Sequence, residues 1–140
     1  MQLRTRVDMR NETTQSAAAL VGRLLLAALF LLEGWSKLRG YGPAAAYMER
    51  FSVPGVLLPT VILAELAGGV LLVVGWQTRC AALALSIFCI VAALLFHTNF
   101  ADRNQLLHFE KDLAIAGGLL VLAAFGPGRF SIEGRRGARR

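Results

Sequence analysis

The sequence predicts an all-α integral membrane protein, an up-down-up-down four-helix bundle with both termini in the cytoplasm. Three observations support this fold class: 56% of the residues are hydrophobic and only 17% are charged, four apolar stretches alternate with short polar links, and arginine is concentrated in the tails. Soluble domains carry roughly 25% charged residues, so this chain lacks the polar groups needed to cover a water-exposed surface. Its 140 residues suffice for one domain.

The four apolar stretches are predicted to span the membrane, because a helix needs about 20 residues to cross the hydrocarbon layer. Pro54 precedes the second span, a turn from Gly75 to Arg79 separates the second from the third, and Gly126 ends the fourth. The fourth apolar run is too short by itself, so its span must include charged residues near position 110. The predicted spans are 17–38, 55–76, 80–97 and 106–126, which form a domain over 17–126 between basic cytoplasmic tails 1–16 and 127–140.

The orientation follows from the distribution of positive charge. With four spans, both tails and the turn at 77–79 lie on one side, which carries nine arginines against five lysines and arginines on the other. Positive residues resist translocation, so this side is predicted to be cytoplasmic. No basic face interleaved with aromatics occurs between the tails, which argues against nucleic acid as a partner. The nine are Arg4, Arg6, Arg10, Arg79, Arg129, Arg135, Arg136, Arg139 and Arg140.

A cleaved signal sequence over residues 1–46 is a competing interpretation of the first apolar stretch. Its apolar core would be residues 24–32 and its cleavage site the alanines at 44–46. A glycine-rich, charged segment separates this short core from the alanines, which favours a membrane span instead.

A weak internal repeat links the second and fourth spans, since Leu66-Ala-Gly-Gly resembles Ile115-Ala-Gly-Gly. Duplication of a helical hairpin and the general use of small residues at helix contacts explain it equally well. In either case, close helix contacts are predicted at Gly68, Gly69, Gly117 and Gly118.

Ionisable residues inside the predicted spans are the strongest functional signal, because a charge near the bilayer centre costs about 2.5–3.5 kcal/mol unless it is paired or faces the bundle interior. At 100° per residue, Arg23, Glu65 and Lys111 each share a helix face with a glycine. We therefore predict that these three form one buried polar network, with Glu33 and Lys37 toward its outer mouth. A structural ion pair and a functional ligand or proton site both remain open for Glu65.

Two histidines are predicted at the outer face, His97 at the end of the third span and His108 near the start of the fourth. Together they could donate hydrogen bonds to a small ligand, hold a haem or metal, or serve as ordinary interfacial residues. Two histidines without an H-E-x-x-H motif or a cysteine pair are a thin ligand set, so no metal site is predicted. Trp35, Tyr41 and Tyr47 are expected in an interfacial aromatic belt on the same side.

Several short motifs follow one another along the chain: Arg23 with Gly34-x-x-Lys37, Glu65-Leu-Ala-Gly-Gly followed by Gly75-x-x-Thr-Arg79, His97-Thr-Asn-Phe, Phe109-x-Lys111 and Gly126-Pro-Gly-Arg-Phe-Ser131. In this order and spacing they resemble the DoxX family of small four-helix bacterial inner-membrane proteins. The resemblance covers roughly residues 20–134. One departure is Asp112, where the family commonly has asparagine.

The resemblance implies a multi-pass protein of the bacterial inner (plasma) membrane that serves a redox or respiratory system. The favoured hypothesis is a subunit without an intrinsic cofactor that binds a quinone-like or other small apolar ligand for a partner oxidoreductase. A non-catalytic scaffold with a structural ion-pair network is the alternative, and a small transporter is less favoured. Enzymatic activity and homo-oligomerisation are left open. The candidate ligand-binding residues are Arg23, Glu33, Lys37, Glu65, His97, His108 and Lys111.

Overall fold

The computed structural model describes residues 2–137, with side chains from Thr13 to Arg135, and every regular element in this range is helical. The all-α prediction is therefore confirmed for the described residues. The elements are α1 (Gln2–Arg39), α2 (Tyr41–Arg50), the short 3-10 helix η1 (Gly55–Leu57), α3 (Leu58–Val74), α4 (Thr78–Phe96), α5 (Arg103–Phe125) and α6 (Ile132–Gly137).

The long helices match the predicted spans to within a few residues at most ends, but the chain between them holds more helix than expected. α1 begins at Gln2, so the basic N-terminal segment continues the first span as helix. α2 lies between the first two predicted spans, where the sequence predicted only a short polar link. Its proline, Pro43, lies in the first turn, where the missing N–H breaks no helical hydrogen bond, and three alanines follow.

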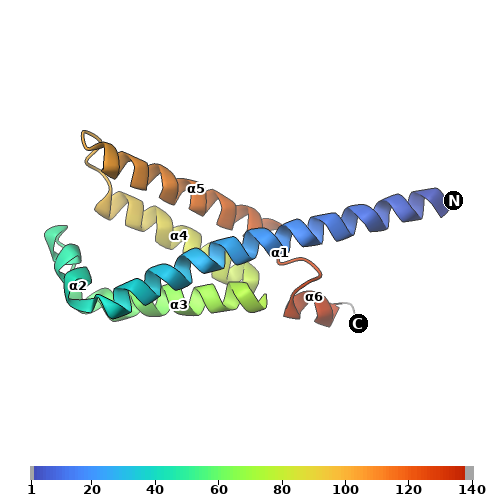
Figure 1. Ribbon diagram of the computed structural model, residues 1–140, viewed down its shortest axis with the longest axis horizontal. Coiled ribbons are helices and arrows are strands. Elements are labelled where there is room, and N and C mark those ends of the chain that lie inside the picture. The colour runs from blue at the N-terminus through green and yellow to red at the C-terminus, as the bar shows by residue number, and fades with distance from the viewer. Residues whose placement is uncertain (1, 138–140) are drawn as a thin grey trace.

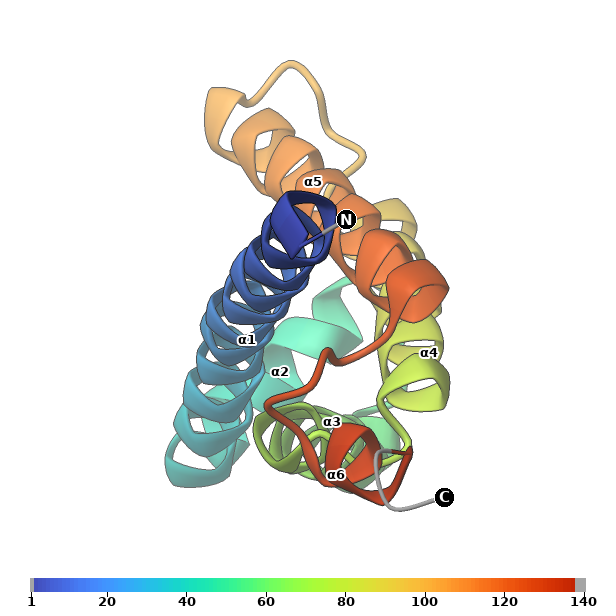
Figure 2. The ribbon, with the colours of Figure 1, turned by 90° about the vertical axis from the view of Figure 1, so that its right-hand side faces the viewer.

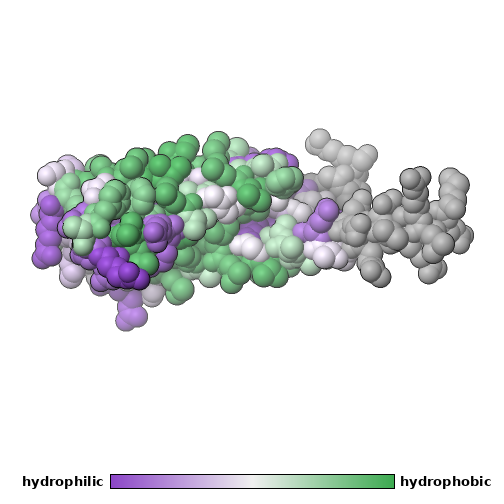
Figure 3. Space-filling model, turned by 90° about the horizontal axis from the view of Figure 1, so that it is seen from above, coloured by the Kyte–Doolittle hydropathy of each residue, from purple (hydrophilic) through white to green (hydrophobic). Residues whose placement is uncertain are grey.

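Three segments are long and apolar enough to cross a membrane: Thr13–Arg39, Gly55–Val74 and Thr78–Phe96. The first half of α5 carries Glu110, Lys111 and Asp112 and is correspondingly less apolar. Hydrophobic side chains cover most of the visible face of the molecule, and hydrophilic ones gather at the end that carries α2 (Figure 3).

The four long helices associate as two pairs, α1 along α3 and α4 along α5, with fewer contacts between the pairs (Figure 1). Side chains from all four helices form the main core, including Phe30, Leu72, Leu85 and Leu119. A smaller cluster of Met48, Leu58 and Ile62 packs α2 against the start of α3. The pairs are thus joined at their centre, and α2 braces one end.

Glycines on α3 allow the close contacts that the sequence predicted. A Cβ atom at Gly68 would lie 2.9 Å from the Leu85 side chain, and one at Gly69 would lie 2.8 Å from Leu31. On α5 the prediction is wrong for Gly117, where an added Cβ atom would have no neighbour within 4 Å among the described residues. At Gly118 such an atom would meet, of these residues, only Leu26 at ordinary contact distance. The residues of α5 that are buried in the core are instead Ala116, Leu119 and Leu122.

Gly69→Val is expected to lower the free energy of unfolding by about 1–3 kcal/mol, because the added atoms meet Leu31 and the Ala27 carbonyl oxygen and force apart α1 and α3. Gly117→Ala is the matched control. It meets open space and replaces glycine in a helix, so stability should be unchanged or rise by up to about 1 kcal/mol. Equilibrium unfolding in mixed micelles measures both. Equal losses for the two variants would contradict the predicted packing.

The end of the bundle opposite α2 is closed by the segment between α5 and α6, residues 126–131, here called the C-terminal strap (Figure 2). Arg23 on α1 is only 2% exposed and donates hydrogen bonds to the carbonyl oxygens of Pro127 (3.0 Å) and Phe130 (2.8 Å). Gly75, with φ +66°, leaves the room for the guanidinium that a side chain there would fill. The guanidinium of Arg23 thus holds the strap against α1.

Candidate functional site

One wall of the site is an ion-pair cluster between α1 and α3. The Nζ atom of Lys37 lies 2.9 Å from Oε1 of Glu65 and 3.0 Å from Oε2 of Glu33. Glu33 and Lys37 are one helical turn apart on α1, whereas Glu65 projects from α3 and is 4% exposed. Oε2 of Glu65 is buried and has no hydrogen-bond partner among the described residues. Among the described residues, the cluster therefore retains one buried acceptor without a partner, Oε2 of Glu65.

The facing wall is built from the end of α4 and the start of α5. Nδ1 of His97 lies 2.9 Å from Oε1 of Gln105, and its Nε2 lies 3.8 Å from Oδ2 of Asp112. The His97 ring stacks on that of His108, with centroids 5.0 Å apart. Asp102 caps α5 by accepting a hydrogen bond from the Asn104 backbone N–H, which fixes where this helix begins.

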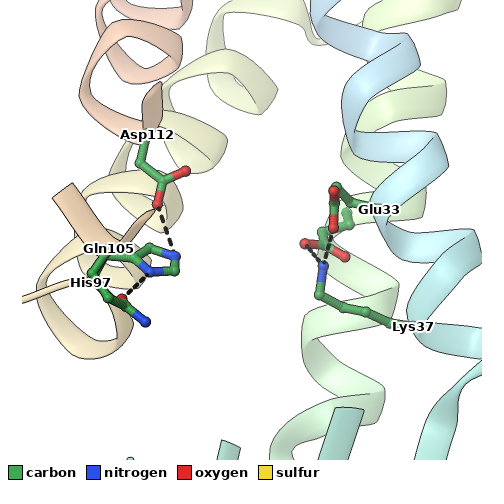
Figure 4. Close-up of polar contacts among 6 residues, drawn as sticks. Glu33, Lys37, His97, Gln105 and Asp112 are labelled. Carbon is green, nitrogen blue, oxygen red and sulfur yellow. Dashed lines mark hydrogen bonds and ion pairs between the residues drawn. The ribbon is translucent and has the colours of Figure 1, made fainter. Parts of the chain in front are cut away.

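A cavity of about 780 Å³, here called the polar cavity, separates these two walls. Its lining comes from α1, α2, η1, α3, α4 and α5 in the half of the bundle nearer α2. Figure 4 shows Glu33 and Lys37 facing His97, Gln105 and Asp112 across open space. Apolar side chains, among them Phe30 and Phe88, supply the rest of the lining. Polar groups on opposite walls of an apolar cavity are typical of a small-molecule site.

Six of the seven candidate residues line the polar cavity: Glu33, Lys37, Glu65, His97, His108 and Lys111. The seventh, Arg23, does not, because it holds the C-terminal strap at the other end. The predicted buried network of Arg23, Glu65 and Lys111 is therefore wrong: Arg23 lies elsewhere, Lys111 is exposed, and Glu65 forms its ion pair in the described part of the chain with Lys37.

The distance between Arg23 and Lys37 along α1 explains why Glu65 pairs with Lys37 and not with Arg23. Fourteen residues separate the two cations on α1, which is about 21 Å along a helix. α3 runs antiparallel to α1 and carries Glu65 in its first half, beside the end of α1 (Figure 1). Of the two, only Lys37 lies at that level, although at 100° per residue both cations lie on nearly the same face of α1.

Tyr47, Gln105 and Asp112 are among the cavity-lining residues that were not predicted as site residues. Tyr47 was expected in an aromatic belt, but α2 places it in the cavity lining, where its ring lies 5.8 Å from that of Phe96. Gln105 and Asp112 hold His97 from the first half of α5. Asp112 had a usable signal, as a charge inside a predicted span, whereas nothing in the sequence singled out Gln105.

Comparison with models of known protein families identifies the family of this chain. The family model of DoxX matches residues 18–98, more than half of the chain. The chain belongs to the DoxX family. The matched segment runs from within α1 to just past the end of α4, so it contains Glu33, Lys37, Glu65 and His97 of the polar cavity. The α5 wall lies beyond the segment that the family model matches.

Two relatives of this DoxX protein come from Escherichia coli (strain K12). Inner membrane protein YqjF is 44% identical over 119 residues, which cover 85% of this chain and 92% of the relative. Inner membrane protein YphA is 28% identical over 123 residues, covering 83% and 88%. No solved structure gives a significant match. Together with the apolar helices, these relatives identify the chain as a multi-pass inner membrane protein.

Proposed function

We propose that this protein is a membrane subunit of a redox system and that its polar cavity binds a quinone-like molecule for a partner oxidoreductase. The observation that carries the proposal is the cavity of about 780 Å³ with Lys37 and Glu65 on one wall and His97 on the other. A quinone ring is flat and apolar, with two oxygens at opposite edges. Hydrogen-bonding groups on two facing walls suit that arrangement.

The chemistry of the two walls also suits the reduced form. A hydroquinone donates two O–H groups, and Glu65 offers a buried carboxylate oxygen without a partner among the described residues. Side chains that can donate to the oxygens of the oxidised form are Lys37, Lys111, His97 and His108. Oxidation of a bound hydroquinone would release two electrons to a redox centre in the partner and two protons to acceptors such as the histidines.

The proposal includes a topology in which α5 is the fourth membrane span. Its 23 residues give a length of about 35 Å, enough to cross the hydrocarbon layer. Asp112, Lys111 and His108 line the polar cavity, so the span need not expose all its polar groups to lipid. Four spans place both basic tails in the cytoplasm. The polar cavity then lies in the periplasmic half of an up-down-up-down bundle.

Binding of decylubiquinone to the full chain in nanodiscs tests the proposed function. His97→Ala and Lys111→Met should each weaken binding about tenfold, the equivalent of one hydrogen bond of about 1.4 kcal/mol. Arg103→Met is the matched control, because Arg103 is an exposed cation on α5 outside the cavity lining. Its affinity should stay within about twofold of wild type. No binding by the wild type, or equal binding by all variants, would refute the proposal.

A scaffold role is the second candidate, and it is favoured by the ion pair itself. Lys37 and Glu65 join α1 to α3 whether or not a ligand is present. In that case the variants of the cavity would change thermal stability in detergent, and added quinone would stabilise none of them. Stabilisation of the wild type by quinone distinguishes the two roles.

A further inference from the structure

The polar cavity reaches the outside of the bundle along an apolar edge beside α4. Leu57, Val91 and Leu95 line the cavity and are also 47%, 47% and 46% exposed. A side chain that lines a cavity and is half exposed lies at its mouth. These residues come from η1 and from the last third of α4. We call this mouth the apolar edge.

The opposite mouth, between α1 and α5, has a different chemistry. Its lining residues include Glu33, His108 and Lys111, which are exposed and polar. At the apolar edge, both flanking segments, Gly55–Val74 and Thr78–Phe96, are candidate membrane spans. The two mouths of the cavity therefore differ in chemistry. One is lined by charged and polar side chains, and the other is lined by apolar side chains and flanked by two candidate membrane spans.

We infer that the tail of an amphiphilic ligand leaves the polar cavity through the apolar edge, between η1 and α4, into the acyl chains. This inference rests on the proposed function and adds the ligand class: a ring head group that carries an isoprenoid or alkyl chain. A cavity of about 780 Å³ accommodates a drug-sized molecule. A long chain must therefore extend outside it. A tail that leaves at the apolar edge moves from one apolar environment to another. A tail that leaves at the charged mouth would desolvate Lys111 and Glu33, which costs free energy.

The test compares two probes on the full chain in nanodiscs: decylubiquinone, and 2,3-dimethoxy-5-methyl-1,4-benzoquinone, which has the same ring without the chain. Leu95→Trp should narrow the apolar edge and lower the affinity for decylubiquinone at least tenfold, where the ligand concentration is expressed per mole of lipid. It should leave the tailless quinone within twofold. Leu94→Trp is the matched control, because Leu94 is 58% exposed on the same helix but does not line the cavity.

Val91→Phe, one helical turn away on the same edge, should show the same selective loss of affinity for decylubiquinone. It keeps the test valid if Leu95→Trp does not fold. The inference is overturned if both edge variants bind decylubiquinone as wild type does, if they lose both quinones equally while remaining folded, or if Leu94→Trp gives the same loss. Failure of the wild type to bind either quinone would instead refute the proposed function. If the wild type binds the tailless quinone but one of the three outcomes that overturn the inference is found, the proposed function still stands.

Discussion

Lys37→Met is expected to lower the free energy of unfolding by about 3–5 kcal/mol. Lys37 is the cation between Glu33 and Glu65, at 3.0 Å and 2.9 Å from their carboxylate oxygens. Its loss leaves two carboxylates facing each other, one of them buried in a membrane span. Removal of one partner of a buried ion pair costs this amount because the remaining charge has no compensation. Equilibrium unfolding in mixed micelles measures the change.

Two further variants separate the ion pair from a general effect of removing a cation. Arg39→Met removes an exposed cation from the same helix and should change stability by less than about 0.5 kcal/mol. The double variant Lys37→Met with Glu65→Leu replaces the pair by apolar side chains and should recover most of the lost stability. If the losses of stability from the two substitutions instead add up in the double variant, Lys37 does not stabilise the protein through its ion pair with Glu65.

Arg23→Met is expected to release the C-terminal strap and to destabilise the chain by about 3 kcal/mol. Arg23 is buried, and hydrogen bonds from a charged donor contribute about 1.5–3 kcal/mol each. Two such bonds, to Pro127 and Phe130, would be lost. Trypsin cleavage after Arg135 reports the release, because the strap precedes it. A local loss of about 3 kcal/mol would accelerate cleavage roughly a hundredfold.

Arg23→Lys is the informative control for this prediction. It keeps the positive charge but replaces the planar guanidinium by one compact ammonium, which cannot reach both carbonyl oxygens with the same geometry. Its cleavage rate should lie between those of wild type and Arg23→Met. If all three chains are cleaved at the same rate, Arg23 does not hold the strap.

The sequence was sufficient to predict the long helices and the burial of Glu65. Apolar runs bounded by Pro54, Gly75 and Gly126 place α3, α4 and α5 to within a few residues. The cost of exposing a charge to lipid implied that Glu65 faces the interior, which the structure confirms by its burial. These inferences depend on local periodicity and on transfer free energy, and both can be assessed within a single helix.

The choice of partners could not be predicted, because it depends on the level at which neighbouring helices meet. Periodicity gives the face of a residue but not its height relative to another helix. That height is set here by α2, whose alanines and proline also fit a turn, and by the C-terminal strap that occupies Arg23. The position of Gln105 against His97 depends on the same tertiary placement of α5.

A structure of the full chain in lipid with bound decylubiquinone is the most direct test of the claim that the polar cavity is a ligand site. We expect the ring inside this cavity, with an oxygen about 2.7–3.2 Å from Nζ of Lys37 or from a ring nitrogen of His97 or His108. A ring on the lipid-facing surface of the bundle, with Lys37 and Glu65 paired and untouched, would contradict it.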